Sequence, residues 1–152
     1  MKIFPFFFLF VFGIGSAQIL DNMAFSVNYR YLGRNALGTG IEFRLSDRNV
    51  ATTNLGVQVL YTSNNGHAKF IPEIHIARAF SNSSLFFAGL SVNPYAVEPQ
   101  VGFNLLNMLS LNTGYALPIH KEKYFRGVTF GFQMNIAPTK RSKFYNTLNV
   151  IQ

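Results

Sequence analysis

The sequence predicts an all-β protein: an eight-stranded, antiparallel, up-and-down transmembrane β-barrel that follows a cleaved signal peptide. Three observations support this prediction. Apolar and polar residues alternate in eight segments of up to about ten residues, which is the length of a tilted strand that crosses a bilayer. The chain is 49% hydrophobic and only 12% charged, about half the charged share of a typical soluble domain. Turn-forming residues separate the alternating segments.

The first seventeen residues have the layout of an export signal that is removed from the mature protein. Lys2 supplies a positive charge, and the apolar stretch Ile3–Ile14 is shorter than the roughly 20 residues that a membrane helix needs. Small residues at 15–17 then fit cleavage before Gln18. We therefore expect three parts: a signal peptide at 1–17, the barrel at 18–137 and a basic C-terminal tail at 138–152.

The first four predicted strands each place bulky apolar residues on one face and polar residues on the other. Successive side chains of a strand point to opposite faces, so this alternation indicates a strand with one apolar face. Leu60 and Ile71 break the pattern, because both are apolar where a polar residue is expected. The segments are Phe25–Tyr31, Gly40–Leu45, Asn54–Tyr61 and Lys69–Ile76.

The last four predicted strands follow the same rule, although Leu85 and Phe87 blur the first of them. The segments are Ser84–Asn93, Val97–Leu105, Leu109–Leu117 and Gly127–Ile136. Asn, Gly, Asp and Pro recur between the segments and favour tight turns. Short connections make neighbours in sequence pair as antiparallel neighbours in space, which gives an up-and-down barrel.

The polar face is predicted to line the barrel interior, and the apolar face to meet lipid. A soluble barrel of the lipocalin type would expose the polar face, which would then be rich in Lys and Glu. Here that face is mostly small or uncharged, and its few charges are mixed in sign, as buried charges must be if they are to pair. We expect an interior polar network of Arg30, Glu42, Arg44, Lys69, Glu73, His75 and Glu98. Space for these side chains is expected beside Gly40, Gly56, Gly89, Gly102, Gly114 and Gly131.

This layout resembles that of the small eight-stranded outer-membrane barrels of Gram-negative bacteria, the group of the OmpA barrel and OmpX. The shared features are the signal peptide, about 135 mature residues, eight alternating strands and the absence of Cys. The resemblance implies location in the outer membrane, contact with its lipid and insertion by the barrel-assembly machinery. Members usually end on an aromatic residue that this machinery recognises. Because this chain ends at Gln152, the expected signal is the strand around Phe130 and Phe132.

Two groups of interior residues have the composition of a chemical site. Glu73, His75 and Ser91 are the residue types of a Ser–His–acid hydrolase. Glu73 and His75 with Glu98 could instead bind a divalent metal. No local motif accompanies either group, so we predict a structural network without catalytic residues, metal or cofactor. The formal net charge of +7 comes from scattered basic residues, and we expect no nucleic-acid partner.

The leading functional hypothesis is a non-enzymatic outer-membrane barrel with a structural or envelope-contact role. The alternatives are an outer-membrane enzyme or narrow pore that uses the charged interior, and a secreted lipocalin-like barrel that binds an apolar ligand. The sequence leaves the oligomeric state open. Among the turns expected to face outward, Pro118–Arg126 is the best candidate contact site. An aromatic girdle is expected from Tyr29, Tyr31, Tyr61, Tyr95, Tyr115 and Tyr124 near the strand ends.

Overall fold

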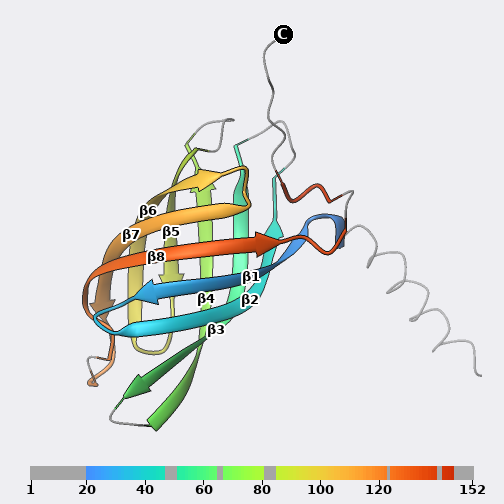
Figure 1. Cartoon of the computed structure of the whole chain (residues 1–152). Coiled ribbons are helices and arrows are strands. Elements are labelled where there is room, and N and C mark those ends of the chain that lie inside the picture. Colours follow the sequence, from blue (N-terminus) through green and yellow to red (C-terminus); the bar gives the residue numbers. More distant parts are fainter. Residues whose placement is uncertain are drawn as a thin grey trace, which may run out of the picture.

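The chain folds into a closed barrel of eight antiparallel strands (Figure 1). The computed structural model describes residues 20–46, 51–64, 67–80, 85–122, 124–139 and 142–145. The strands in these ranges are β1 (Met23–Tyr31), β2 (Asn35–Arg44), β3 (Thr53–Asn64), β4 (His67–Ala79), β5 (Phe86–Val92), β6 (Ala96–Leu105), β7 (Leu109–Pro118) and β8 (Gly127–Ile136). Each strand pairs with the next, so the predicted all-β, up-and-down, eight-stranded barrel is confirmed. The described residues contain no helix long and apolar enough to span a membrane.

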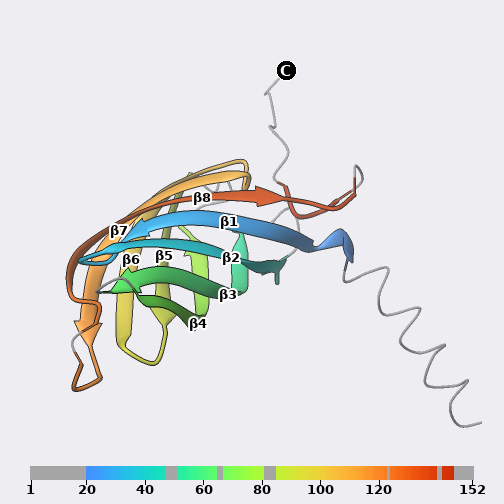
Figure 2. The same ribbon diagram turned by 60° about the horizontal axis from the view of Figure 1, so that its bottom comes forward.

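The barrel closes where the first strand meets the last. β1 and β8 pair antiparallel over seven positions, from Phe25 opposite Ile136 to Tyr31 opposite Phe130. Figure 2 shows the sheet curving round until β8 lies beside β1. Closure gives the first and last strands partners for the backbone groups that an open sheet would leave unpaired at its edges.

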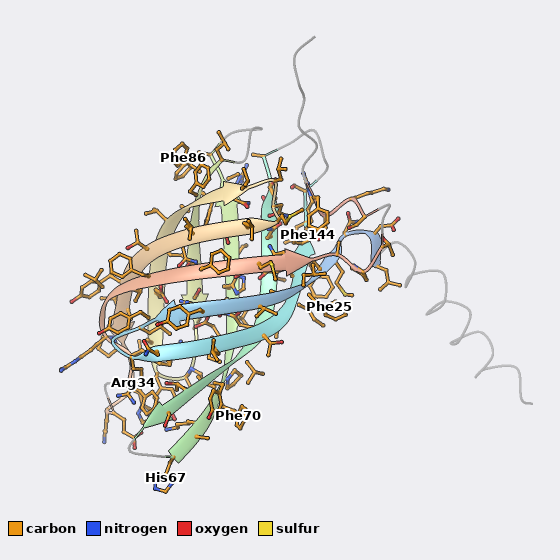
Figure 3. All side chains as sticks on the ribbon, viewed as in Figure 1. Phe25, Arg34, His67, Phe70, Phe86 and Phe144 are labelled. Atoms are coloured by element: carbon orange, nitrogen blue, oxygen red, sulfur yellow. The ribbon has the colours of Figure 1, made fainter. Side chains whose placement is uncertain are left out.

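Most large apolar side chains of the strands point outward. Figure 3 shows Phe25, Phe70 and Phe86 projecting away from β1, β4 and β5. Their exposed fractions are 49%, 70% and 58%, whereas the alternate residues of the same strands are mostly buried. The polar face is therefore the interior, as the sequence predicts.

The structure starts β2 five residues earlier than the sequence predicts. The sequence predicts a strand that begins at Gly40, but the turn after β1 occupies only Leu32–Arg34, where the Leu32 amide donates to the Arg34 carbonyl over 2.9 Å. Gly33 has a φ of 80°, a value that favours glycine, and allows this short connection. Gly38 lies inside β2, where a side chain would overlap the carboxamide of Asn28.

An apolar plug fills one end of the barrel, which we call the loop end because it carries the turn Leu32–Arg34 and the connections that follow β3, β5 and β7. Leu60 and Ile71, the two departures from the predicted pattern, point inward and belong to this plug. Phe125, from the β7–β8 connection, inserts among them and is fully buried. The plug consists of Leu32, Ala36, Leu60, Ile71, Ala96, Ala116, Tyr124 and Phe125, with Tyr95 packed against it.

Two of the tyrosines predicted for the aromatic girdle belong to the plug instead. Tyr124 is buried, and its ring centroid lies 5.0 Å from that of Tyr95. The girdle prediction is therefore wrong for Tyr95 and Tyr124, because both lie on connections that fold over the barrel mouth. Within the predicted contact site Pro118–Arg126, the exposed part is reduced to 118–122 and Arg126 among the described residues. The other four tyrosines of the expected girdle are exposed on the outer face: Tyr29, Tyr31, Tyr61 and Tyr115.

Candidate functional site

One arginine between two glutamates occupies the barrel interior. Arg30 on β1 reaches across to Glu73 on β4 with its Nη1 atom and to Glu98 on β6 with its Nη2 atom. All three side chains are almost fully buried. Charges removed from water are tolerable only when they are paired and hydrogen-bonded. The group therefore joins three strands across the interior.

Neutral side chains complete the hydrogen bonding of both carboxylates. Glu73 Oε1 accepts from Gln58 Nε2 over 2.6 Å, and its Oε2 accepts from Asn93 Nδ2 over 2.9 Å. Glu98 Oε1 accepts from the Thr129 hydroxyl over 2.6 Å. Each carboxylate thus has a partner on both oxygens, which offsets the cost of burial.

A second pair of ionisable side chains joins β2 to β4. His75 Nε2 lies 2.6 Å from Glu42 Oε1, and the same oxygen accepts from Gln133 Nε2 over 2.9 Å. Gly56 on β3 makes this pair possible, because a side chain there would overlap the His75 ring and approach Glu42 Oε1 at 2.5 Å. The expected role of glycines as interior space is confirmed at this position. Gly102 plays the same role for the inward-facing Phe87.

Two of the seven predicted network residues lie at the ends of the barrel. Lys69 is at the loop end, partly exposed, with Nζ 3.7 Å from Glu122 and 4.5 Å from the ring centroids of Tyr95 and Tyr124. The assignment of Lys69 to the interior network is wrong, because the apolar plug lies between this residue and the group formed by Arg30, Glu73 and Glu98. Arg44 is buried at the opposite end, where its Nη1 atom donates to the Phe144 carbonyl over 3.3 Å.

We call this opposite end the tail end, because it carries residues 20–22, the turn Leu106–Met108 and the described C-terminal segment Ser142–Tyr145. Phe144 is fully buried there. Its carbonyl accepts from Asn107 Nδ2 over 2.9 Å and from Arg44 Nη1 over 3.3 Å. Figure 3 shows Phe144 near the end of β8 that lies farthest from the loop end.

The segment around Phe144 is held by further hydrogen bonds. The Lys143 amide and the Ser142 hydroxyl both donate to the Asp21 carbonyl, over 2.7 Å and 3.0 Å. The Tyr145 hydroxyl accepts from the Ala137 amide over 2.6 Å and donates to the Asn135 carbonyl over 3.0 Å. The described part of the predicted basic tail is therefore packed against the barrel. Its only sequence signal is the aromatic pair Phe144–Tyr145 in a polar stretch.

Asn107 organises the side chains at the tail end. It lies in the β6–β7 turn with a φ of 61°, a conformation that Asn adopts more readily than most residues. Its Oδ1 atom accepts from Asn54 over 2.6 Å and from Asn104 over 3.1 Å, while its carbonyl accepts from Asn135 over 3.1 Å. The sequence predicts only a turn at this residue, so its role as a hydrogen-bonding centre was missed.

A polar cavity of about 40 Å³ extends from the Glu42–His75 pair to Asn107. Carboxamide side chains provide most of its polar wall. The small side chains of Ala77, Ala79 and Ser110 leave the space for the cavity. The lining residues are Glu42, Thr52, Asn54, His75, Ala77, Ala79, Phe87, Gln100, Asn104, Asn107, Ser110, Asn112, Gln133 and Asn135. The cavity is large enough for a few water molecules, since one water needs about 10–15 Å³ of such space.

The residues of the proposed Ser–His–acid set lie on neighbouring strands, but their side chains bond to other groups instead of to one another. His75 and Ser91 are cross-strand partners, yet His75 Nε2 faces Glu42, and Ser91 Oγ accepts from Gln100 Nε2 over 3.1 Å. The described residues show no hydrogen bond that would activate Ser91 through His75. The acid named for both chemical hypotheses, Glu73, is occupied by Arg30.

The metal hypothesis fails on the same grounds. Glu73 and Glu98 are held apart by the guanidinium of Arg30, which occupies the position where a shared cation would lie. Within the described ranges, no three side chains of His, Cys, Asp or Glu come close enough to hold a metal ion. Together, these residues form a buried polar network beside a small cavity. Comparison of this chain with protein-family models, curated proteins and solved structures gave no match.

Proposed function

We propose that this chain is an integral outer-membrane β-barrel whose role is structural, through contact with the cell envelope. The observation that carries the proposal is the composition of the outer face. Among the described strand residues, Arg78 is the only charged residue that points outward, and it lies near the tail end of β4. A long basic side chain near a strand end can extend to the lipid headgroups.

The size of the exposed apolar surface supports lipid as its surroundings. The exposed large apolar side chains range from 37% exposed at Met134 to 70% at Phe70, and they occur on all eight strands. A soluble monomer rarely exposes an apolar patch larger than about 300–600 Å². Lipid would cover this surface, while barrel closure pairs backbone groups that hydrocarbon cannot hydrate.

The filled interior favours a structural role over a pore. The apolar plug closes the loop end, Phe144 covers part of the tail end, and Arg30 with its two carboxylates occupies the space between. The loop end also carries exposed polar side chains, including His67, His120, Lys121 and Glu122. These give the envelope-contact role its candidate surface.

Fractionation of expressing cells, followed by gel electrophoresis of the membrane fraction, tests the proposal. We expect the protein in the outer-membrane fraction, with a mobility that shifts on boiling because a folded barrel resists the detergent. Recovery from the periplasm or the medium without detergent would contradict the proposal. In that case the apolar outer face would need a protein partner instead of lipid.

A further inference from the structure

Three buried polar atoms in the wall of the interior cavity have no hydrogen-bond partner among the described residues. They are His75 Nδ1, Gln100 Oε1 and Asn112 Oδ1. Leaving a buried polar atom unpaired costs about 1–3 kcal/mol. Such atoms in folded proteins are usually paired with ordered water when no protein group reaches them.

We infer that this cavity binds a small cluster of water molecules, and that Phe144 covers the cavity at the tail end. Gln100 and Asn112 present carbonyl oxygens, so the occupant must donate hydrogen bonds. The volume of about 40 Å³ admits a few water molecules. Water is the donor that fits both the size and the chemistry.

The two ends of the barrel differ in a way that sets the route to the cavity. At the loop end, the side chains of Leu60, Ile71 and Phe125 are buried and apolar, so a polar solute has no favourable path there. At the tail end, the cavity wall is formed by carboxamides up to Asn107. The route therefore runs through the tail end.

Phe144 is positioned to close this route. Asn107 both lines the cavity and donates to the Phe144 carbonyl, so the cover and the cavity wall share a residue. Arg44 binds the same carbonyl, and Asp21 anchors the two residues before it. The Phe144 side chain is itself fully buried, so it covers this part of the tail end. The inference does not depend on whether lipid surrounds the barrel.

A single reporter cysteine tests the cover. The chain has no Cys, so Ser110→Cys introduces one thiol in the cavity wall with little change in size. The probe is methyl methanethiosulfonate, a small neutral thiol reagent, applied to the folded protein in detergent. We expect Phe144→Ala to raise the rate of modification at position 110 severalfold, because Ser110 is only partly exposed and the rate follows access to the cavity wall.

Met108→Cys serves as the matched control. Met108 lies at the same end but is 43% exposed, so the reagent should modify it rapidly with or without Phe144. A heat-dependent gel shift verifies that each variant is folded, and Phe144→Leu replaces Phe144→Ala if the latter does not fold. Equal rates at position 110 with and without the Phe144 substitution would overturn the role of Phe144 as cover.

Occupancy by water is tested by nuclear magnetic resonance of the detergent-solubilised protein. We expect Overhauser cross-peaks between water and the side-chain amide hydrogens of Gln100 and Asn112. An exposed carboxamide such as that of Asn35 provides the positive control. A dry cavity, with cross-peaks at Asn35 but none at Gln100 or Asn112, would overturn the inference.

Discussion

At the scale of single residues, Arg30 matters most because it satisfies two buried carboxylates at once. Each carboxylate has further partners, but only Arg30 supplies a positive charge to both. Replacing a buried ion pair with matched neutral groups is often tolerated, whereas removal of one partner leaves a buried charge uncompensated. The stability of the network is therefore expected to depend on the balance of positive and negative charge more than on any single hydrogen bond.

Arg30→Met tests this dependence. We expect it to lower the free energy of unfolding by about 3–5 kcal/mol, because it leaves Glu73 and Glu98 buried and unpaired. Urea unfolding of the protein refolded into phospholipid vesicles measures the change. The triple variant with Glu73→Gln and Glu98→Gln removes the carboxylates as well, and should recover most of the loss. If the triple variant is as unstable as Arg30→Met alone, packing and not charge explains the role of Arg30.

At the scale of elements, the sequence predicts the strands well because every strand has two chemically distinct faces. A shift of the pairing register by one residue would point all the interior polar side chains of a strand outward. The direction of each side chain is therefore strongly specified. The sequence prediction starts β2 too late, at Gly40. Gly38 already lies in the strand, where it leaves room for the side chain of Asn28. Turn residues and space-making residues are the same amino acid, and the sequence does not distinguish them.

The β7–β8 connection stabilises the barrel through its buried aromatic residue. We expect Phe125→Ala to lower the free energy of unfolding by about 3–5 kcal/mol, since it opens a cavity in the apolar plug. Ile119→Ala in the same connection is the control. Its side chain is 60% exposed, so its truncation should change stability by about 0.5 kcal/mol or less. Similar losses for the two variants, measured by urea unfolding, would show that Phe125 does not anchor the plug.

Two positions on β1 test what surrounds the barrel. Val27 is at the middle of the strand and Met23 at its tail-end limit, and both point outward. If lipid surrounds the outer face, Val27→Arg should cost about 2–4 kcal/mol, and Met23→Arg only about 0–1 kcal/mol. Unfolding from phospholipid vesicles gives both values. Equal, small costs would indicate water at both positions and would argue against a transmembrane barrel.

At the scale of the whole molecule, the sequence could not predict the height of a residue along the barrel axis. Lys69 and Arg44 alternate correctly, yet they lie at opposite ends of the barrel. Strand stagger sets these heights, and it depends on pairing across all eight strands. Phe144 was missed for a different reason, because one aromatic residue in a polar tail has no periodicity to detect. The ends of the barrel were therefore the least predictable part, and they carry the plug and the cover.

Closure between β1 and β8 makes the most direct prediction about the whole barrel. Val27 and Met134 are partners across this seam, and the absence of native Cys leaves no competing thiol. Val27→Cys with Met134→Cys should oxidise to a disulfide that links the first strand to the last. A crosslink closing a loop of about 100 residues stabilises a protein by up to about 4.7 kcal/mol in the chain-entropy model. The boiled, unreduced variant should therefore migrate differently from the reduced one.

The control pairs Val27→Cys with Leu111→Cys. Leu111 also points outward but lies on β7, opposite Phe132 and not beside β1. This pair should remain reduced within one molecule under the same oxidation, because the two Cα atoms are separated by the width of β8 and exceed the reach of a disulfide. Equal crosslinking of both pairs would mean that the seam opens in solution. Crosslinking of the Val27–Met134 pair alone would show that the barrel is closed in the register described, so that the interior network and its cavity are enclosed on all sides by strands.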